Sequence, residues 1–129
     1  MDAKAHNTPL SDDECRQLLL GHDLGRVAWA TPDGIAVLPV SYVLAGERIV
    51  FRTAAGSQLA GLVDPQPVGF EIDDLDPETR TGWSVLVRGT SGPAAPGEAD
   101  AAEPWAPGDR PVMVAIEPSA YSGRAIAAG

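Results

Sequence analysis

The chain has 129 residues and a formal net charge of −9, so we expect one domain that does not bind polyanionic nucleic acid. Hydrophobic residues make up 44% of the sequence, an ordinary globular proportion that is sufficient for a buried core. A lone cysteine excludes an internal disulfide and a cysteine-rich metal site, and no apolar run approaches membrane-spanning length. We therefore expect a cytoplasmic protein without a metal, nucleic-acid or membrane partner.

The N-terminal region predicts a tail and then a helix. Residues 1–9 are polar and are expected to form a flexible tail, followed by a single domain over residues 10–129. Ser11 and Glu14 have the spacing of a capping box, in which each side chain pairs with the backbone N–H of the other residue. Leucines at 18–20 give the helix an apolar side, and Gly21 marks its end.

From Gly25 onward the sequence alternates with the period of β-strands. Pro39 lies inside the second predicted strand and indicates an edge, a bulge or a bend, because proline cannot donate to the sheet ladder. Six antiparallel strands, with one helix in front and another between strands three and four, predict a mainly β fold, a small barrel. The predicted strands are 26–31, 35–44, 48–53, 67–73, 83–90 and 111–117, with a short helix at 58–63, an acidic loop at 74–82 and a long surface excursion at 93–110.

The segment after the third predicted strand combines groups that bind phosphate. Arg52 supplies a fixed positive charge with forked donors, and Thr53 and Ser57 supply hydroxyl donors. A glycine turn then leads to the start of a short helix, where unpaired backbone N–H groups attract anions. These residues predict a cradle for a phosphate-bearing cofactor. The alternative is a strand, a turn and a capped helix with a solvated Arg52.

The order of these elements, together with several short motifs, resembles the pyridoxamine 5′-phosphate oxidase-like, flavin-binding split-barrel family, in its small bacterial branch of flavin and deazaflavin reductases. The motifs, within about residues 10–126, are EC at 14–15, GRVA at 25–28, PVSY at 39–42, FRT at 51–53, GSQL at 56–59, VGFEID at 68–73 and GWSVLVRG at 82–89. The resemblance implies a six-stranded antiparallel split β-barrel. It also implies a homodimer with cofactor sites at the interface.

The same resemblance implies which residues bind the cofactor, which is FMN or alternatively the deazaflavin F420. The backbone of residues 39–42 is expected along the isoalloxazine ring, and the cradle is expected to take the phosphate. Trp83 is expected to stack on the ring or line the pocket, with a core or interface position as its alternative. The expected cofactor-binding residues are Pro39, Val40, Ser41, Tyr42, Arg52, Thr53, Ser57, Gln58 and Trp83.

Two residues depart from the family pattern. Gln58 stands where the family usually has a lysine after the serine of the phosphate segment, so a neutral amide replaces a point charge. Ser41 stands where the family has an asparagine, which shortens the polar reach toward the cofactor ring.

These features predict a flavin-nucleotide-binding protein that acts as an oxidoreductase on a small-molecule substrate. In such a site the cofactor supplies the hydride chemistry, and no side chain is needed as a catalyst. Two other functions stay open: a non-enzymatic protein that binds a flavin, haem or another ligand, and a barrel whose cofactor site has decayed. The strength of the phosphate cradle distinguishes the three.

Overall fold

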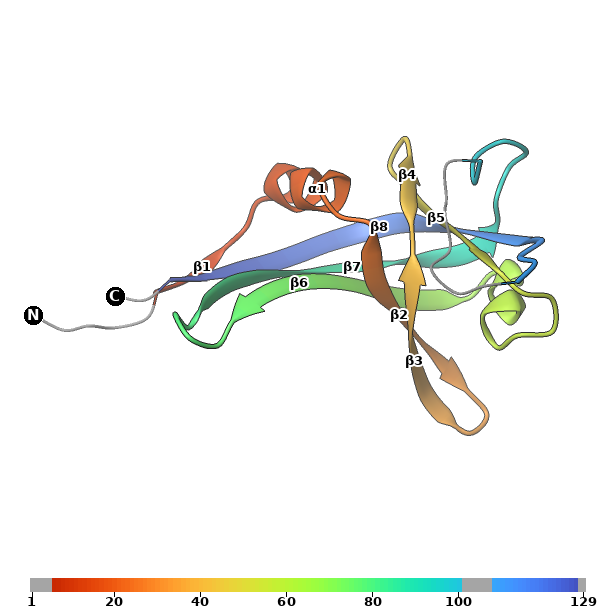
Figure 1. Cartoon of the computed structure of the whole chain (residues 1–129), viewed down its shortest axis with the longest axis horizontal. Coiled ribbons are helices and arrows are strands. Elements are labelled where there is room, and N and C mark those ends of the chain that lie inside the picture. Colours follow the sequence, from red (N-terminus) through yellow and green to blue (C-terminus); the bar gives the residue numbers. More distant parts are fainter. Residues whose placement is uncertain (1–5, 101–107, 128–129) are drawn as a thin grey trace, which may run out of the picture.

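The computed structural model describes residues 6–100 and 108–127, which form a curled antiparallel sheet with one short α-helix (Figure 1). The long strands of the sheet run along the longest dimension of the molecule, and a shorter hairpin crosses them (Figure 1). In chain order the elements are β1 (His6–Pro9), α1 (Asp12–Leu20), β2 (Leu24–Thr31), β3 (Gly34–Ser41), β4 (Val43–Ala45), β5 (Arg48–Thr53), the 3₁₀ turn η1 (Leu59–Val63), β6 (Pro67–Asp76), β7 (Thr81–Pro93) and β8 (Val112–Ala127).

Helix α1 begins and ends where the sequence predicts. The hydroxyl of Ser11 accepts from the N–H of Glu14 at 3.1 Å, and the carboxylate of Glu14 accepts from the N–H of Ser11 at 2.9 Å, so the capping box is complete. Cys15 and Leu19 form the buried side of the helix, and Gly21 caps its C-terminus. With this side, α1 packs on β7 and β8 and covers one face of the sheet (Figure 1).

The sheet follows the strand order β3-β2-β6-β7-β8-β5-β4, and β1 pairs with β8. Its curl encloses the core, which α1 and η1 help to close. Each large apolar side chain that is fully removed from water contributes about 1.5–3 kcal/mol to stability. The largest are Leu19, Ile49, Phe51, Leu62, Phe70, Ile72 and Ile116.

The structure corrects the predicted strand count, because the described residues form eight strands rather than six. The predicted strand 35–44 breaks at Tyr42 into β3 and β4. At this point the N–H of Tyr42 donates to the carbonyl of Asp23 at 2.9 Å, which draws the chain away from the ladder. Pro39 lies in β3, which is the first strand of the sheet order, so the edge interpretation of this proline is confirmed.

Other boundaries differ from the sequence analysis as well, and β8 runs to Ala127, well beyond the predicted strand 111–117. Residues 6–9, which the sequence assigns to the tail, form β1 because they pair with residues 124–127 of β8. The predicted helix at 58–63 is the 3₁₀ turn η1, which begins at Leu59. Residues 74–76 of the predicted acidic loop extend β6, because they pair with residues 81–83 of β7.

No helix in the described part of the chain has the length and apolar character needed to cross a bilayer. Across residues 6–100 and 108–127, no group of three or more histidine, cysteine, aspartate and glutamate side chains is placed to hold a metal ion.

Candidate cofactor-binding site

The turn between β5 and η1 brings two of the predicted phosphate ligands together. Thr53 ends β5, and its hydroxyl oxygen lies 2.8 Å from that of Ser57. The hydroxyl of Ser57 also accepts from the N–H of Ala60 at 3.2 Å, and so it caps the first turn of η1. Gly56 has φ +77°, a left-handed conformation that favours glycine and lets the chain reverse within these few residues.

Gln58 lies on the rim of this turn. Its side chain is exposed and makes no capping hydrogen bond, so its amide is free to face a ligand. Several backbone groups of the turn are already used, since the N–H of Ser57 donates to Ala54 at 3.3 Å and that of Gly61 donates to Gln58 at 3.2 Å. Thr53 is only 2% exposed and its hydroxyl is bonded to that of Ser57, so the turn offers the surface the hydroxyl of Ser57 and the amide of Gln58, both of them neutral.

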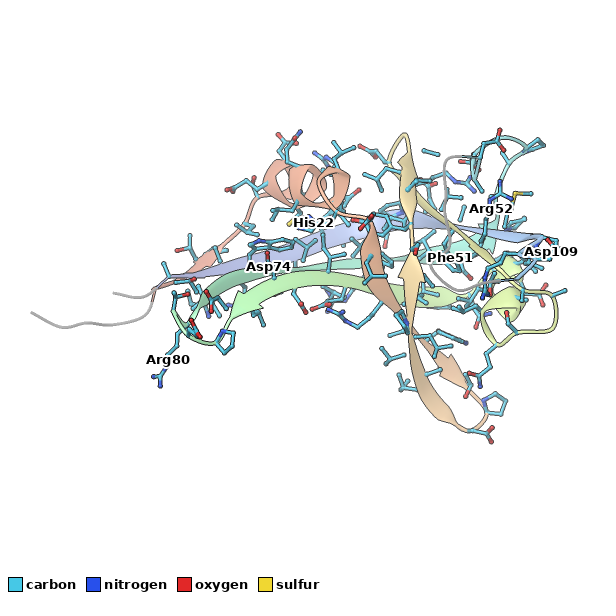
Figure 2. The ribbon with its side chains drawn as sticks, in the orientation of Figure 1. His22, Phe51, Arg52, Asp74, Arg80 and Asp109 are labelled. Carbon is cyan, nitrogen blue, oxygen red and sulfur yellow. The ribbon has the colours of Figure 1, made fainter. Side chains whose placement is uncertain are left out.

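Arg52 does not join these residues. Successive side chains of a strand point to opposite faces of a sheet, and Thr53 points into the main core. Arg52 lies on the other face, where its Nε donates to the carbonyl of Ala99 at 2.9 Å and its terminal nitrogen lies 3.7 Å from the carboxylate of Asp100 (Figure 2). The structure thus places the cation of the predicted cradle across β5 from Thr53, and the role of Arg52 as a phosphate ligand stays a prediction. Side chains alternate between the two faces of a strand along residues 48–53, so the sequence alone could have shown that Arg52 and Thr53 lie on opposite faces.

The β5–η1 turn has hydrogen-bond donors for a phosphate, but Arg52 does not add its positive charge to them. Ser57 and Gln58 can donate hydrogen bonds to phosphate oxygens, whereas the guanidinium of Arg52 is held on the opposite face of β5. Charge-assisted hydrogen bonds are roughly twice as strong as neutral ones. The turn therefore fits the neutral part of a flavin nucleotide better than its terminal phosphate.

The predicted ring-binding segment at 39–42 divides between surface and core. Pro39 is exposed and Ser41 partly so, whereas Val40 is only 6% exposed and belongs to the core. Tyr42 is also buried. Its hydroxyl donates to the carbonyl of Leu19 at 2.7 Å, so its proton is already used within the fold and Tyr42 packs in the core.

Trp83 lies partly buried at the start of β7, next to α1. Its ring is 4.7 Å from that of His22 in an edge-on arrangement, and Nδ1 of His22 is 2.7 Å from the carbonyl oxygen of Leu18. Figure 2 shows His22 near α1 and Phe51 and Arg52 toward the other end of the molecule. Within a single chain, the predicted site residues therefore lie in separate places.

The outer face of the sheet, on the side away from α1, carries an apolar surface. Ile35 and Val37 in β3 are 73% and 56% exposed, and they pair across the ladder with Ala30 and Ala28 of β2. Next to them is a groove of about 580 Å³. We call the surface made by Ala28, Ala30, Ile35, Val37, Gly69 and Leu86 the outer patch.

A cluster of one arginine and two acids adjoins the outer patch. Arg26 contacts the carboxylates of Glu71 and Asp73 at 2.5 and 2.6 Å. Burial raises the pKa of Glu71, whereas a hydrogen bond from Glu71 lowers the pKa of Asp73, so a proton on Glu71 would be shared with its neighbour. Arg26 balances one of the two acids, so the ionised cluster keeps a single negative charge beside the exposed apolar side chains of Ile35 and Val37.

Comparison with known proteins gives the chain a family context. The family model described as pyridoxamine 5'-phosphate oxidase matches residues 11–125. The uncharacterized protein Rv0080 of Mycobacterium tuberculosis is 33% identical over 92% of this chain and 85% of its own length. The FAD binding protein from Mycobacterium smegmatis is 30% identical, with a TM-score of 0.74 over 93% of this chain and 98% of that chain. A FAD-binding protein from Mesorhizobium loti shares the fold, with a TM-score of 0.78 at 19% identity over 96% of this chain and 99% of that chain.

Proposed function

This chain belongs to the pyridoxamine 5'-phosphate oxidase family, and we propose that it binds a flavin nucleotide and acts as a flavin- or deazaflavin-dependent oxidoreductase on a small molecule. The observation that carries the proposal is the match of residues 11–125 to the family model. The 30% identity to a solved protein named as FAD binding supports the flavin part of it. The bound cofactor would supply the hydride chemistry, and the protein would bind and orient it.

The β5–η1 turn supports FMN as the first ligand to test and F420 as its alternative. Ser57 and Gln58 would donate to the ribityl chain or the phosphate, the buried hydroxyl of Thr53 would hold Ser57 in place, and Pro39 and Ser41 would lie along the ring. Because Arg52 lies across β5 from this group, we expect ring contacts and neutral hydrogen bonds to carry most of the affinity.

We also propose a homodimer that pairs two outer patches. Ile35 and Val37 leave a strongly exposed apolar surface, and a two-fold partner with the same patch would cover it. The separation of Trp83 from the β5–η1 turn within one chain supports this assembly, because residues of two chains could then share one site. The cofactor sites would lie between the subunits.

A non-enzymatic role for the same flavin-binding surface is the second candidate. It is favoured by the β5–η1 turn, whose neutral donors suit reversible ligand binding rather than permanent retention of a cofactor. Bleaching of a bound flavin by a nicotinamide reductant, followed by reoxidation with an added acceptor, would distinguish the enzyme from the binding protein.

The direct test is a titration of the purified chain with FMN, FAD, F420 and riboflavin, followed by flavin fluorescence and by calorimetry. We expect saturable binding of at least one flavin nucleotide at one site per subunit. If FMN binds more tightly than riboflavin, the protein contacts the phosphate, because the two compounds differ only in that group. Absence of saturable binding for all four compounds would reject the proposed function and leave the decayed-barrel interpretation.

A further inference from the structure

The face of β5 opposite Thr53 is covered by a short segment that follows β7. We call residues 94–100 the strap. The N–H of Ala94 donates to the carbonyl of Met113 at 3.1 Å where the strap leaves the sheet. Further along, Ala99 is fully buried and packs with Val50 of β5 and Ala115 of β8 in a small cluster separate from the main core. The methyl group of Ala99 is therefore the most deeply buried apolar group that the strap contributes to this cluster.

Two arginines of β5 hold the strap in place. Arg48 and Arg52 are four residues apart, so both lie on the strap side of the strand. Arg52 binds the carbonyl of Ala99 at 2.9 Å and faces the carboxylate of Asp100 at 3.7 Å. The Nε of Arg48 lies 3.3 Å from the carboxylate of Glu98. Backbone and acidic groups of one segment thus occupy both guanidinium groups.

The ionic contacts of Arg48 are imperfect. Its terminal nitrogen donates to the carbonyl of Pro93 at 3.1 Å, but its Nε is buried and makes no hydrogen bond, because the contact with Glu98 is ionic only. The carboxylate of Glu117 lies 3.9 Å from the same Nε and would stay there if the strap moved. A buried guanidinium N–H without an acceptor is costly. An anion whose oxygen is placed to accept from this N–H would therefore bind more favourably than the carboxylate of Glu98 does.

The strap contacts are weak enough for an external anion to compete with them. The side chains of Arg52 and Asp100 are 26% and 77% exposed, so water and salt screen this ion pair, and they screen the pair of Arg48 and Glu98, at 36% and 17%, to a smaller degree. Guanidinium groups bind phosphate oxygens with two parallel hydrogen bonds, which the carbonyl and single carboxylate oxygens of the strap do not supply. The α-carbons of Arg48 and Arg52 are roughly 13 Å apart at the rise of an extended strand, a span that suits more than one phosphate group.

We propose that the strap face of β5 is a binding site for a diphosphate-bearing anion, with Arg48 and Arg52 as its ligands and the strap as its displaceable occupant. Glu98, Asp100 and the carbonyl of Ala99 stand in for the phosphate oxygens in the free chain. The site is on the opposite face of β5 from Thr53, so it exists whether or not a flavin binds at the β5–η1 turn. The nucleotide diphosphates are the natural chemical class of ligand.

Inorganic pyrophosphate, titrated by calorimetry at low ionic strength, is the probe for this site. The double variant Glu98→Gln/Asp100→Asn removes the competing charges and should bind pyrophosphate about tenfold more tightly than the unaltered chain, because two partly exposed ion pairs amount to roughly that factor. The matched control Asp76→Asn/Glu78→Gln makes the same change in net charge at the β6–β7 turn, away from the strap, and should leave the affinity within about twofold of the unaltered chain. Equal tightening in both double variants would overturn the proposal, and so would no tightening in the strap variant.

Adding Arg52→Gln to the strap variant should abolish its gain in affinity. Persistent tight binding in that triple variant would place the anion elsewhere and also overturn the proposal. Should the strap variant fail to fold, the unaltered chain provides a second measurement. A glutamyl endopeptidase cuts after Glu98 only when the strap leaves β5, so pyrophosphate should accelerate this cut relative to potassium chloride of equal ionic strength. An unchanged or slower cut would contradict displacement of the strap.

Discussion

The hydroxyl of Tyr42 donates to the carbonyl oxygen of Leu19 at 2.7 Å, and both residues are only 2% exposed. The last carbonyls of an α-helix have no partner within the helix, so this bond satisfies one of them. The ring of Tyr42 also packs edge-on against Phe70, with 5.0 Å between the ring centroids. Tyr42 therefore joins the end of α1 to the sheet at the point where the chain passes from β3 to β4.

We expect Tyr42→Phe to lower the free energy of unfolding by about 1–2 kcal/mol, because it keeps the ring but leaves the carbonyl of Leu19 with only the long bond from the N–H of His22 at 3.5 Å. Tyr121→Phe is the matched control, because Tyr121 is only partly buried and packs beside the guanidinium of Arg16. Urea denaturation measures both changes. Equal losses in the two variants would show that the contact with Leu19 carries no particular weight.

The stability of the chain should also fall at alkaline pH. Burial, reinforced by the carboxylate of Asp23, raises the pKa of Tyr42 above its ordinary value of 10.0. The folded chain keeps a proton that the unfolded chain loses, so the contribution of Tyr42 is complete below pH 10 and is lost as the pH rises toward the folded-state pKa. Urea titrations on both sides of pH 10 should show a steeper decline in the unaltered chain than in Tyr42→Phe. Parallel declines would be incompatible with this assignment.

Features set by neighbouring residues could be predicted from the sequence. Ser11 and Glu14 define the helix start through contacts three residues apart, and the box forms as expected. Pro39 indicated an edge strand because its missing N–H is a local property. Thr53 and Ser57 meet because a tight turn leaves them few other positions.

Features that depend on distant residues could not be predicted in this way. Residues 6–9 have little strand character of their own and become a strand only by pairing with β8. The break at Tyr42 depends on the carbonyls of Asp23 and Leu19, which reach it from the end of α1 and the loop after it. Arg52 is different, since alternation along β5 was sufficient to separate it from Thr53. Its actual partners, Ala99 and Asp100, come from a segment far along the chain.

Two strand glycines should respond differently to alanine. A Cβ at Gly89 would lie 2.4 Å from the carbonyl oxygen of Glu117, next to the irregularity between Arg88 and Gly89 in the pairing of β7 with β8. Backbone cannot yield as a side chain can, so Gly89→Ala should cost about 2 kcal/mol or more. At Gly69 the nearest atom is 3.6 Å away, and Gly69→Ala should stay within about 1 kcal/mol of the unaltered chain. Thermal unfolding of both variants measures this difference, and comparable losses would argue against the tight approach at Gly89.

The proposed dimer predicts that a charge in the outer patch will dissociate it. We expect Val37→Glu to convert the dimer to a monomer, because the charge would have to be buried against the second copy. Leu20→Glu is the control, since Leu20 is 63% exposed on α1, which covers the other face of the sheet. Light scattering with size-exclusion chromatography gives the mass of each variant. A monomeric unaltered chain at micromolar concentration, or a dimeric Val37→Glu variant, would reject this interface.

Gln58 tests whether charge is what the β5–η1 turn lacks. Its exposed amide lies on the rim beside the paired hydroxyls of Thr53 and Ser57, so a lysine there can reach a phosphate without disturbing the core. We expect Gln58→Lys to tighten FMN binding by about tenfold, through a charge-assisted bond of about 1–2 kcal/mol. Riboflavin, which has no phosphate, should bind the variant and the unaltered chain equally.

Gln17→Lys is the matched control for Gln58→Lys, because it adds the same charge at an exposed position of α1. Titrations in increasing salt complete the test, since a partly exposed ion pair is screened and the advantage of Gln58→Lys should shrink. An equal increase in FMN affinity in both lysine variants would show that the effect comes from net charge and not from a contact at position 58. Tighter binding of riboflavin as well as FMN by Gln58→Lys would mean that the lysine contacts the ring or the ribityl chain, and the phosphate would then lie away from the β5–η1 turn.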